Sequence, residues 1–164
     1  FLLFNNADNI NFKGNTKTII YDTLDDIMVT SEDGLFVIQP DRTITAVKNA
    51  VVTQTEKTLT ADKIILYYTE DKENRIEKIE AFGHVKAWTP DEEITGERGD
   101  YNPKTGLITM TDNVTLTQGV NTMSGDRAFM NMQTGVSTLS EKPNKNPDDI
   151  KKRVRGSLIP AQLK

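Results

Sequence analysis

The chain has 164 residues, which is enough for one domain with a hydrophobic core. Its formal net charge of −4 and its pI near 5.1 argue against a nucleic acid or an anionic membrane surface as partner, because both attract basic proteins. It contains no cysteine, which excludes disulfides and thiolate chemistry and fits either the cytosol or an oxidising compartment. The sequence has no apolar run of about 18 residues that would predict a transmembrane helix.

The first 26 residues are expected to form an N-terminal extension. The apolar stretch 1–4, followed by Ala7, is typical of the end of a signal peptide with its cleavage site. The same residues fit the start of a strand equally well, and both interpretations stay open. Segments 9–13 and 17–22 are predicted to pair as a hairpin that precedes the main domain, which we place at 27–164.

Through most of the remaining chain, β-branched and aromatic residues alternate with polar ones, and turn-forming clusters interrupt them. Signals for helix are scarce, so the sequence predicts an all-β domain of antiparallel strands. A polar, proline-bearing segment at 142–152 is expected to form a mobile loop before a last strand at 153–160. The other expected strands are 27–30, 35–39, 42–47, 51–54, 57–68, 76–81, 85–89, 93–98, 107–111, 114–118, 121–131 and 136–139.

A repeated unit of about 30 residues organises these strands. The acids Asp33, Asp62, Glu97 and Asp126 occupy equivalent positions in four units and are 29, 35 and 29 residues apart. Six extra residues within 69–75 account for the longer step. Units of this size stack and bury their apolar faces against their neighbours. The sequence therefore predicts a long surface rather than a catalytic pocket.

Two sets of largely apolar positions flank each acid and predict a bend between them. Because seven residues separate the two sets, a flat strand would place them on opposite faces. A bulge or bend at the acid would bring both sets to one face. The same bend in every unit predicts a sheet creased into a V or a flattened barrel, apolar inside and polar outside. The two sets are Thr30, Leu59, Ile94 and Met123 before the acid, and Val37, Leu66, Tyr101 and Met130 after it.

The composition of these inward positions suggests a groove. They contain several methionine and threonine residues and few bulky aromatic ones. Methionine adapts to apolar ligands of variable shape, although an ordinary core that uses methionine as a filler remains an alternative. The residues predicted to line the groove are Met28, Thr30, Val37, Leu59, Leu66, Ile79, Ile94, Tyr101, Ile108, Met110, Leu116, Met123 and Met130.

The sequence offers little for catalysis. Its single histidine, His84, lies in a turn at a position where other units have asparagine, so a role in the turn is expected. The paired acids at 92–93 and 148–149 match no metal-binding loop, and phosphate-binding glycine-rich loops are absent. We therefore predict no catalytic residues, no metal and no cofactor, and a protein that is not an enzyme.

The order and spacing of several short motifs resemble the OstA/LptA family over roughly residues 27–164. The C-terminal motif is similar to the ending typical of that family. The motifs are VVTQ at 51–54, TLTADKII at 58–65, NVTLTQG at 113–119, SGDR at 124–127 and RVRGSLIPAQL at 153–163.

This resemblance implies a V-shaped, twisted antiparallel β-jellyroll, open at both ends, in the periplasm of a Gram-negative bacterium. It implies a bridge that carries lipopolysaccharide from the inner to the outer membrane, with the acyl chains in the groove. The implied partners are lipopolysaccharide, LptC-like and LptD-like domains paired through edge strands, and further copies of the chain, head to tail.

Two other functions stay open. The first is one of the related domains, either the periplasmic part of LptC or the N-terminal domain of LptD. An N-terminal membrane helix would mark the LptC domain, and a following outer-membrane barrel would mark the LptD domain. Neither is present in this sequence, so an LptA-type bridge is expected. A purely structural β-repeat module with a fully packed interior is the second alternative.

Overall fold

The computed structural model describes residues 9–13, 18–22, 26–38, 41–69, 75–140 and 155–157. They form one sheet of twelve strands paired antiparallel, so the predicted all-β fold is confirmed. None of these residues forms a helix long and apolar enough to cross a membrane. The strands are β1 (Asn9–Lys13), β2 (Thr18–Asp22), β3 (Ile27–Ser31), β4 (Gly34–Ile38), β5 (Thr43–Gln54), β6 (Lys57–Tyr68), β7 (Ile76–Trp88), β8 (Glu92–Asn102), β9 (Leu107–Gln118), β10 (Asn121–Asn131), β11 (Val136–Ser140) and β12 (Arg155–Ser157).

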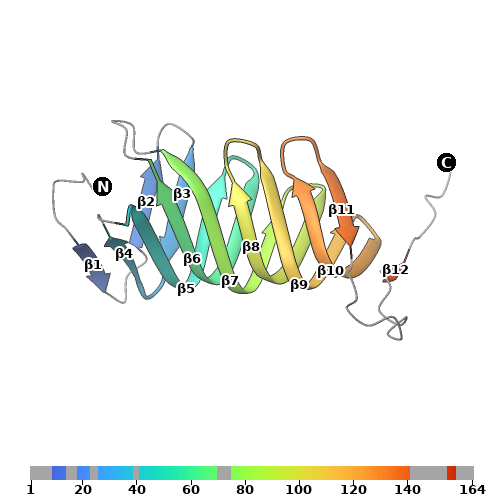
Figure 1. Cartoon of the computed structure of the whole chain (residues 1–164), viewed down its shortest axis with the longest axis horizontal. Helices are drawn as coiled ribbons and strands as arrows, with labels where there is room; N and C mark the ends of the chain where they lie inside the picture. The colour runs from blue at the N-terminus through green and yellow to red at the C-terminus, as the bar shows by residue number, and fades with distance from the viewer. Residues whose placement is uncertain are drawn as a thin grey trace.

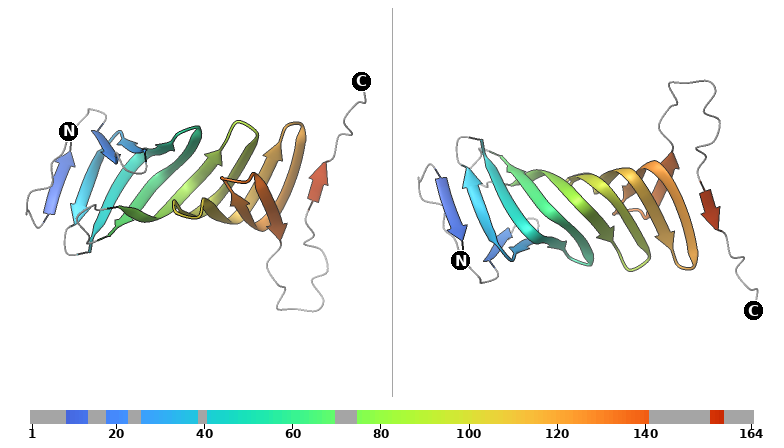
Figure 2. Two further views of the ribbon diagram at one scale, coloured as in Figure 1. Left: turned by 90° about the horizontal axis from the view of Figure 1, so that it is seen from above. Right: turned by 90° about the horizontal axis from the view of Figure 1, so that it is seen from below.

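The long strands β5 to β10 run through two layers that lie face to face (Figure 1). We call one layer half-sheet A, with the strand order β1-β4-β5-β6-β7-β8-β9-β10-β11. Half-sheet B contains the other halves of β5 to β10, with β3 and β2 added at one end and β12 at the other. The division is clear in β5, which pairs with β4 through 43–47 and with β3 through 51–54. Figure 2 shows β1 and β12 at opposite ends of the long axis.

The half-sheets meet along a crease, where the strand register shifts. The pairing of β5 with β6 skips from Val47 to Ala50, and that of β7 with β8 skips from Phe82 to Val85. The same irregularity recurs where β6 pairs with β7, β8 with β9, and β9 with β10. The bend predicted from the repeated units is therefore present in every long strand.

Left-handed backbone conformations produce the crease on alternate strands. Pairs of residues with positive φ interrupt β5, β7 and β9 at this line. The facing strands carry the repeated acids there, with Asp62 and Glu97 exposed inside the shifted registers. Asparagine, aspartate and glycine tolerate positive φ better than other residues, which explains their recurrence at these turns. The six positive-φ residues are Lys48, Asn49, Gly83, His84, Asp112 and Asn113.

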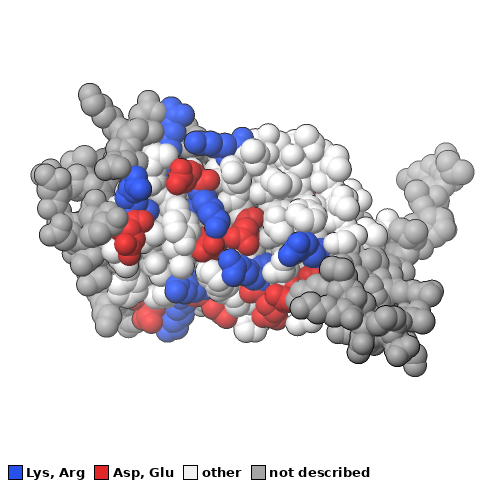
Figure 3. All heavy atoms as spheres, in the orientation of Figure 1, with Lys and Arg blue, Asp and Glu red and all other residues white. Residues whose placement is uncertain are grey.

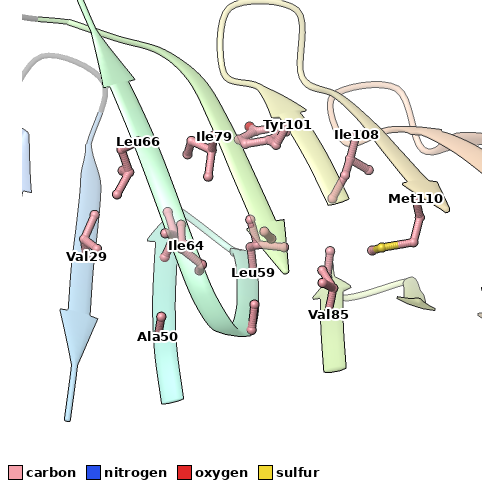
Figure 4. Packing of buried hydrophobic residues seen from close by; sticks show 14 of the residues in the cluster. Val29, Ala50, Leu59, Ile64, Leu66, Ile79, Val85, Tyr101, Ile108 and Met110 are labelled. Atoms are coloured by element: carbon pink, nitrogen blue, oxygen red, sulfur yellow. The ribbon is translucent and has the colours of Figure 1, made fainter. Parts of the chain in front are cut away.

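Small and large side chains are interspersed from strand to strand beside the crease. The small inward residues Ala81 and Gly99 lie beside the larger Ile64 and Met110 there, which lets the two layers approach closely. Larger aliphatic side chains fill the middle of the V and point toward one another from the two layers (Figure 4). Their burial supplies most of the stability of the fold, at about 25 cal/mol per Å² of apolar surface.

The N-terminal segments pair differently from the expected hairpin. β1 pairs with β4 in half-sheet A, whereas β2 pairs with β3 in half-sheet B. β1 and β2 therefore each add one strand to a different half-sheet, next to β4 and β3, which are separated at Glu32 and Asp33. The expected loop at 142–152 and the residues before Asn9 lie outside the described part of the chain. Of the expected last strand at 153–160, the structure describes β12.

Candidate functional site

Most of the predicted groove residues lie inside the V. The nine buried ones have at most 5% of their surface exposed, and Met123 is partly buried against the same cluster. They come from both half-sheets and form one continuous apolar interior along the stack. The nine are Leu59, Leu66, Ile79, Ile94, Tyr101, Ile108, Met110, Leu116 and Met130.

Two of the predicted residues lie on the opposite face. Met28 is paired with Thr53 and Thr30 with Val51, so both point away from the inward residue Val29, although Thr30 is also buried, with 4% of its surface exposed. The repeat alignment placed Asp33 opposite Asp62, but the first unit contains one more residue at the crease than the others. Two exposed residues, Glu32 and Asp33, are followed there by Gly34. The extra residue moves the inward-facing positions of β3 by one place relative to the repeat alignment.

For Val37 the structure describes only the backbone. It pairs in register with Ile44 of β5, and Ile44 pairs with Leu66 of β6. Its side chain lies outside the described part of the chain, so its place in the groove stays a prediction.

The interior is closed in this structure. Between Val52 and Leu59 of half-sheet B and Tyr101 and Ile108 of half-sheet A, the free cavity measures only about 10 Å³. A cavity of this size holds one water molecule at most. The two apolar layers therefore pack directly on each other, and an acyl chain would have to separate them.

Opposite the crease, the hairpin turns of the two half-sheets form the two rims of the V, which we call the mouth. A hollow of about 720 Å³ lies at the mouth toward the C-terminal half of the stack. Acidic, hydroxyl and amide side chains line it, with Lys57 as the one cation among its lining residues. The lining residues include Glu56, Asp91, Glu92, Gln118, Asn121 and Gln133.

Two side-chain hydrogen bonds cross the mouth from one half-sheet to the other. The Tyr101 hydroxyl donates to the Gln54 side-chain oxygen at 2.7 Å. The Ser137 hydroxyl donates to a carboxylate oxygen of Glu92, also at 2.7 Å. Sequence analysis assigned Tyr101 to the groove but missed the polar role of its hydroxyl and the other three residues. Gln54 and Glu92 stand at strand ends, and Ser137 occupies an inward position that is isoleucine in other units, which were the signals available.

The outer face of half-sheet A carries mixed charges that neutralise one another. Glu80 accepts hydrogen bonds from Lys78 at 2.6 Å and from Tyr67 at 2.8 Å, and Arg98 lies 3.4 Å away. The bond from Lys78, supported by that from Tyr67, holds the pKa of Glu80 below its usual value. Basic and acidic side chains likewise alternate over the middle of the face shown in Figure 3. Such a surface forms no basic clamp for phosphate groups.

His84 lies at the crease. Its Nδ1 is 2.8 Å from a carboxylate oxygen of Asp62, and this hydrogen bond raises the pKa of His84. Both side chains are exposed to solvent, and the pair sits on the convex side of the bend, away from the apolar interior. Among the described residues, no three histidine or acidic side chains are grouped so that they could hold a metal ion.

These features define an open, creased β-jellyroll built from stacked units around an apolar interior. Residues 29–136 match the family described as LptA/(LptD N-terminal domain) LPS transport protein. The chain belongs to this family of lipopolysaccharide transport components, which is not a family of enzymes. No curated protein sequence matches it.

A solved structure shares the fold. The crystal structure of LptH from Pseudomonas aeruginosa is described as the LptA homologous periplasmic component of the conserved lipopolysaccharide transport device. It superposes with a TM-score of 0.67 at 16% sequence identity, over 86% of this chain and 100% of LptH. The predicted V-shaped jellyroll, open at both ends, is confirmed by this likeness.

Proposed function

We propose that this protein is an LptA-type bridge in the periplasm that shields the acyl chains of lipopolysaccharide between its two half-sheets. The observation that supports this most is the continuous apolar interior, which runs through the stack between the two half-sheets. Each buried CH₂ group contributes about 0.8 kcal/mol, so parts of several acyl chains would give affinity without specific polar contacts.

The surface of the protein fits a transient carrier. Its net charge is −4, and on the described outer face of half-sheet A the charges are mixed, so phosphate groups of lipopolysaccharide would meet no strong basic site there. Tight ionic binding of these groups would slow release to the next protein of the bridge. The proposed partners are lipopolysaccharide, LptC-like and LptD-like domains, and further copies of this chain that pair through the edge strands.

Photo-crosslinking tests the groove. A photoreactive amino acid at Ile94 or Met123 should capture lipopolysaccharide, because both side chains face the interior. The same group at Thr95, the next residue on the outer face of β8, is the matched control and should capture little. Equal capture at the inner and outer positions would contradict the groove.

The closed interior favours one alternative, a structural β-repeat module. A cavity of only about 10 Å³ is typical of a fully packed hydrophobic core. Purified protein that neither retains nor binds labelled lipopolysaccharide, although folded, would support this alternative.

A further inference from the structure

The two hydrogen bonds across the mouth are a feature that the apolar groove does not require. They join Tyr101 to Gln54 and Ser137 to Glu92. Tyr101 and Glu92 are each 5% exposed, and both hydrogen bonds are partly buried. Buried polar groups of this kind are stable only with hydrogen-bond partners. The bonds therefore favour the closed arrangement of the two half-sheets.

The position of these residues in the sheet shows that both bonds span the V. Gln54 ends β5 in half-sheet B, and Tyr101 belongs to the part of β8 in half-sheet A. Within either half-sheet, β6 and β7 lie between β5 and β8. A contact between Gln54 and Tyr101 must therefore cross from one layer to the other.

The second bond repeats this geometry farther along the stack. Glu92 begins β8 in half-sheet B, and Ser137 lies on β11 of half-sheet A. Here β9 and β10 lie between the two strands. Both bonds thus join a strand of half-sheet B to the strand three places along in half-sheet A. This regular offset follows from the twist of the two layers.

The bonds lie between the apolar interior and the polar hollow. The small cavity beneath the first bond is lined by Gln54 and Tyr101 themselves together with Leu59 and Ile108. Glu92 of the second bond lines the hollow of about 720 Å³. An amphiphile that enters sideways would place its head group at the hollow and would have to push its acyl chain past these side chains.

We propose that Gln54, Tyr101, Glu92 and Ser137 form a clasp that holds the lipid-free interior shut and opens when an acyl chain enters through the mouth. This inference rests on the proposed function, since it regulates access to the same groove. It assigns a gating role to polar residues that the apolar repeat pattern does not explain. The hydroxyl and amide groups near the acyl chains of an incoming lipid would replace the broken bonds.

Removing the donor hydroxyls tests the clasp without changing the apolar packing. Tyr101→Phe and Ser137→Ala, separately and together in the full chain, should raise the rate of uptake of fluorescein-labelled lipopolysaccharide, by about fivefold for one lost bond. Tyr67→Phe removes a similar hydrogen bond on the outer face, and Ser124→Ala removes an outer hydroxyl of β10. Both controls should leave the rate unchanged. Unchanged rates in all variants would overturn the clasp.

A reversible cross-link provides the opposite test. The chain has no cysteine, so Gln54→Cys with Tyr101→Cys can be bridged by a bifunctional methanethiosulfonate and released with reductant. The bridged protein should lose lipopolysaccharide uptake and regain it on reduction. A Tyr67→Cys/Glu80→Cys pair, bridged on the outer face within half-sheet A, should bind throughout.

The outcomes separate this inference from the proposed function. Wild-type protein that binds lipopolysaccharide, together with equal binding by the bridged Gln54/Tyr101 variant, would overturn the clasp and leave the groove standing. Wild-type protein that is folded by circular dichroism but binds no lipopolysaccharide would overturn the proposed function, and the clasp with it.

Discussion

At the scale of single residues, the angle of the V depends on how little space the side chains occupy at the crease. A Cβ added to Gly99 would lie 3.1 Å from Val85 Cγ1, which is too close for an unstrained contact. A Cβ at Gly125 would lie 3.0 Å from Leu139 Cγ. The absence of side chains at these positions lets Val85 and Leu139 occupy the narrow end of the interior.

A charge in the interior should destabilise the protein strongly. Ile94 is fully buried, so Ile94→Asp would place an unpaired carboxylate between two packed apolar layers. We expect the free energy of unfolding to fall by about 3 kcal/mol or more, as measured by urea denaturation. Thr95→Asp, the adjacent change on the outer face, should change it by about 0.5 kcal/mol or less. Similar losses in the two variants would contradict the assignment of the two faces.

The pair at the crease predicts a pH effect. Because the hydrogen bond with Asp62 raises the pKa of His84, the folded protein binds this proton more tightly than the unfolded chain does. The pair therefore stabilises the fold fully below the unfolded pKa, about 6.5, and this contribution is lost as the pH rises through the higher folded pKa. An NMR titration of the single imidazole should give a higher pKa in the wild type than in Asp62→Asn. Identical values would show that the pair does not form in solution.

At the scale of elements, the sequence predicted the strands well where the alternation is regular. β6 and β10 have the expected bounds, and the expected segments 76–81 and 85–89 join into β7 across the crease. The alternation could not reveal that β1 and β2 belong to different half-sheets, because pairing partners depend on register between distant segments. The repeat alignment also assigned Met28 and Thr30 to the wrong face of β3. One extra residue at a crease inverts the faces of a strand, and the alternation alone does not reveal it.

The open edges of the stack predict self-association. β11 and β12 end the two half-sheets and pair only with β10 in the described structure. An exposed edge strand offers unpaired N–H and C=O groups to another chain. Deleting residues 153–164, which removes β12, should therefore reduce concentration-dependent oligomers while the central units still bind lipid. Light scattering checks the oligomers, and an unchanged distribution would exclude the β12 edge as the junction.

At the scale of the whole molecule, two properties of the interior oppose each other. Its length and apolar character suit acyl chains, whereas its close packing leaves no room for them. Both hold if the half-sheets separate at the mouth while the crease acts as the hinge. On each side of the crease the backbone pairing of β5 to β9 is regular except for one shift at Tyr67 and Tyr68, so each half-sheet would move as a unit. The register shifts at the crease are where such a rotation would be absorbed.

This hinge motion predicts a change in distance across the mouth. Spin labels at Glu56→Cys and Gln133→Cys would lie on opposite rims of the hollow, in a chain without other cysteines. Pulsed electron paramagnetic resonance should show the distance between them growing by several ångströms when lipopolysaccharide is added, because acyl chains then separate the layers. Labels at Lys78→Cys and Thr138→Cys both lie on the outer face of half-sheet A, and their distance should stay constant. If the rims keep their distance although lipopolysaccharide binds, the lipid does not lie between the half-sheets.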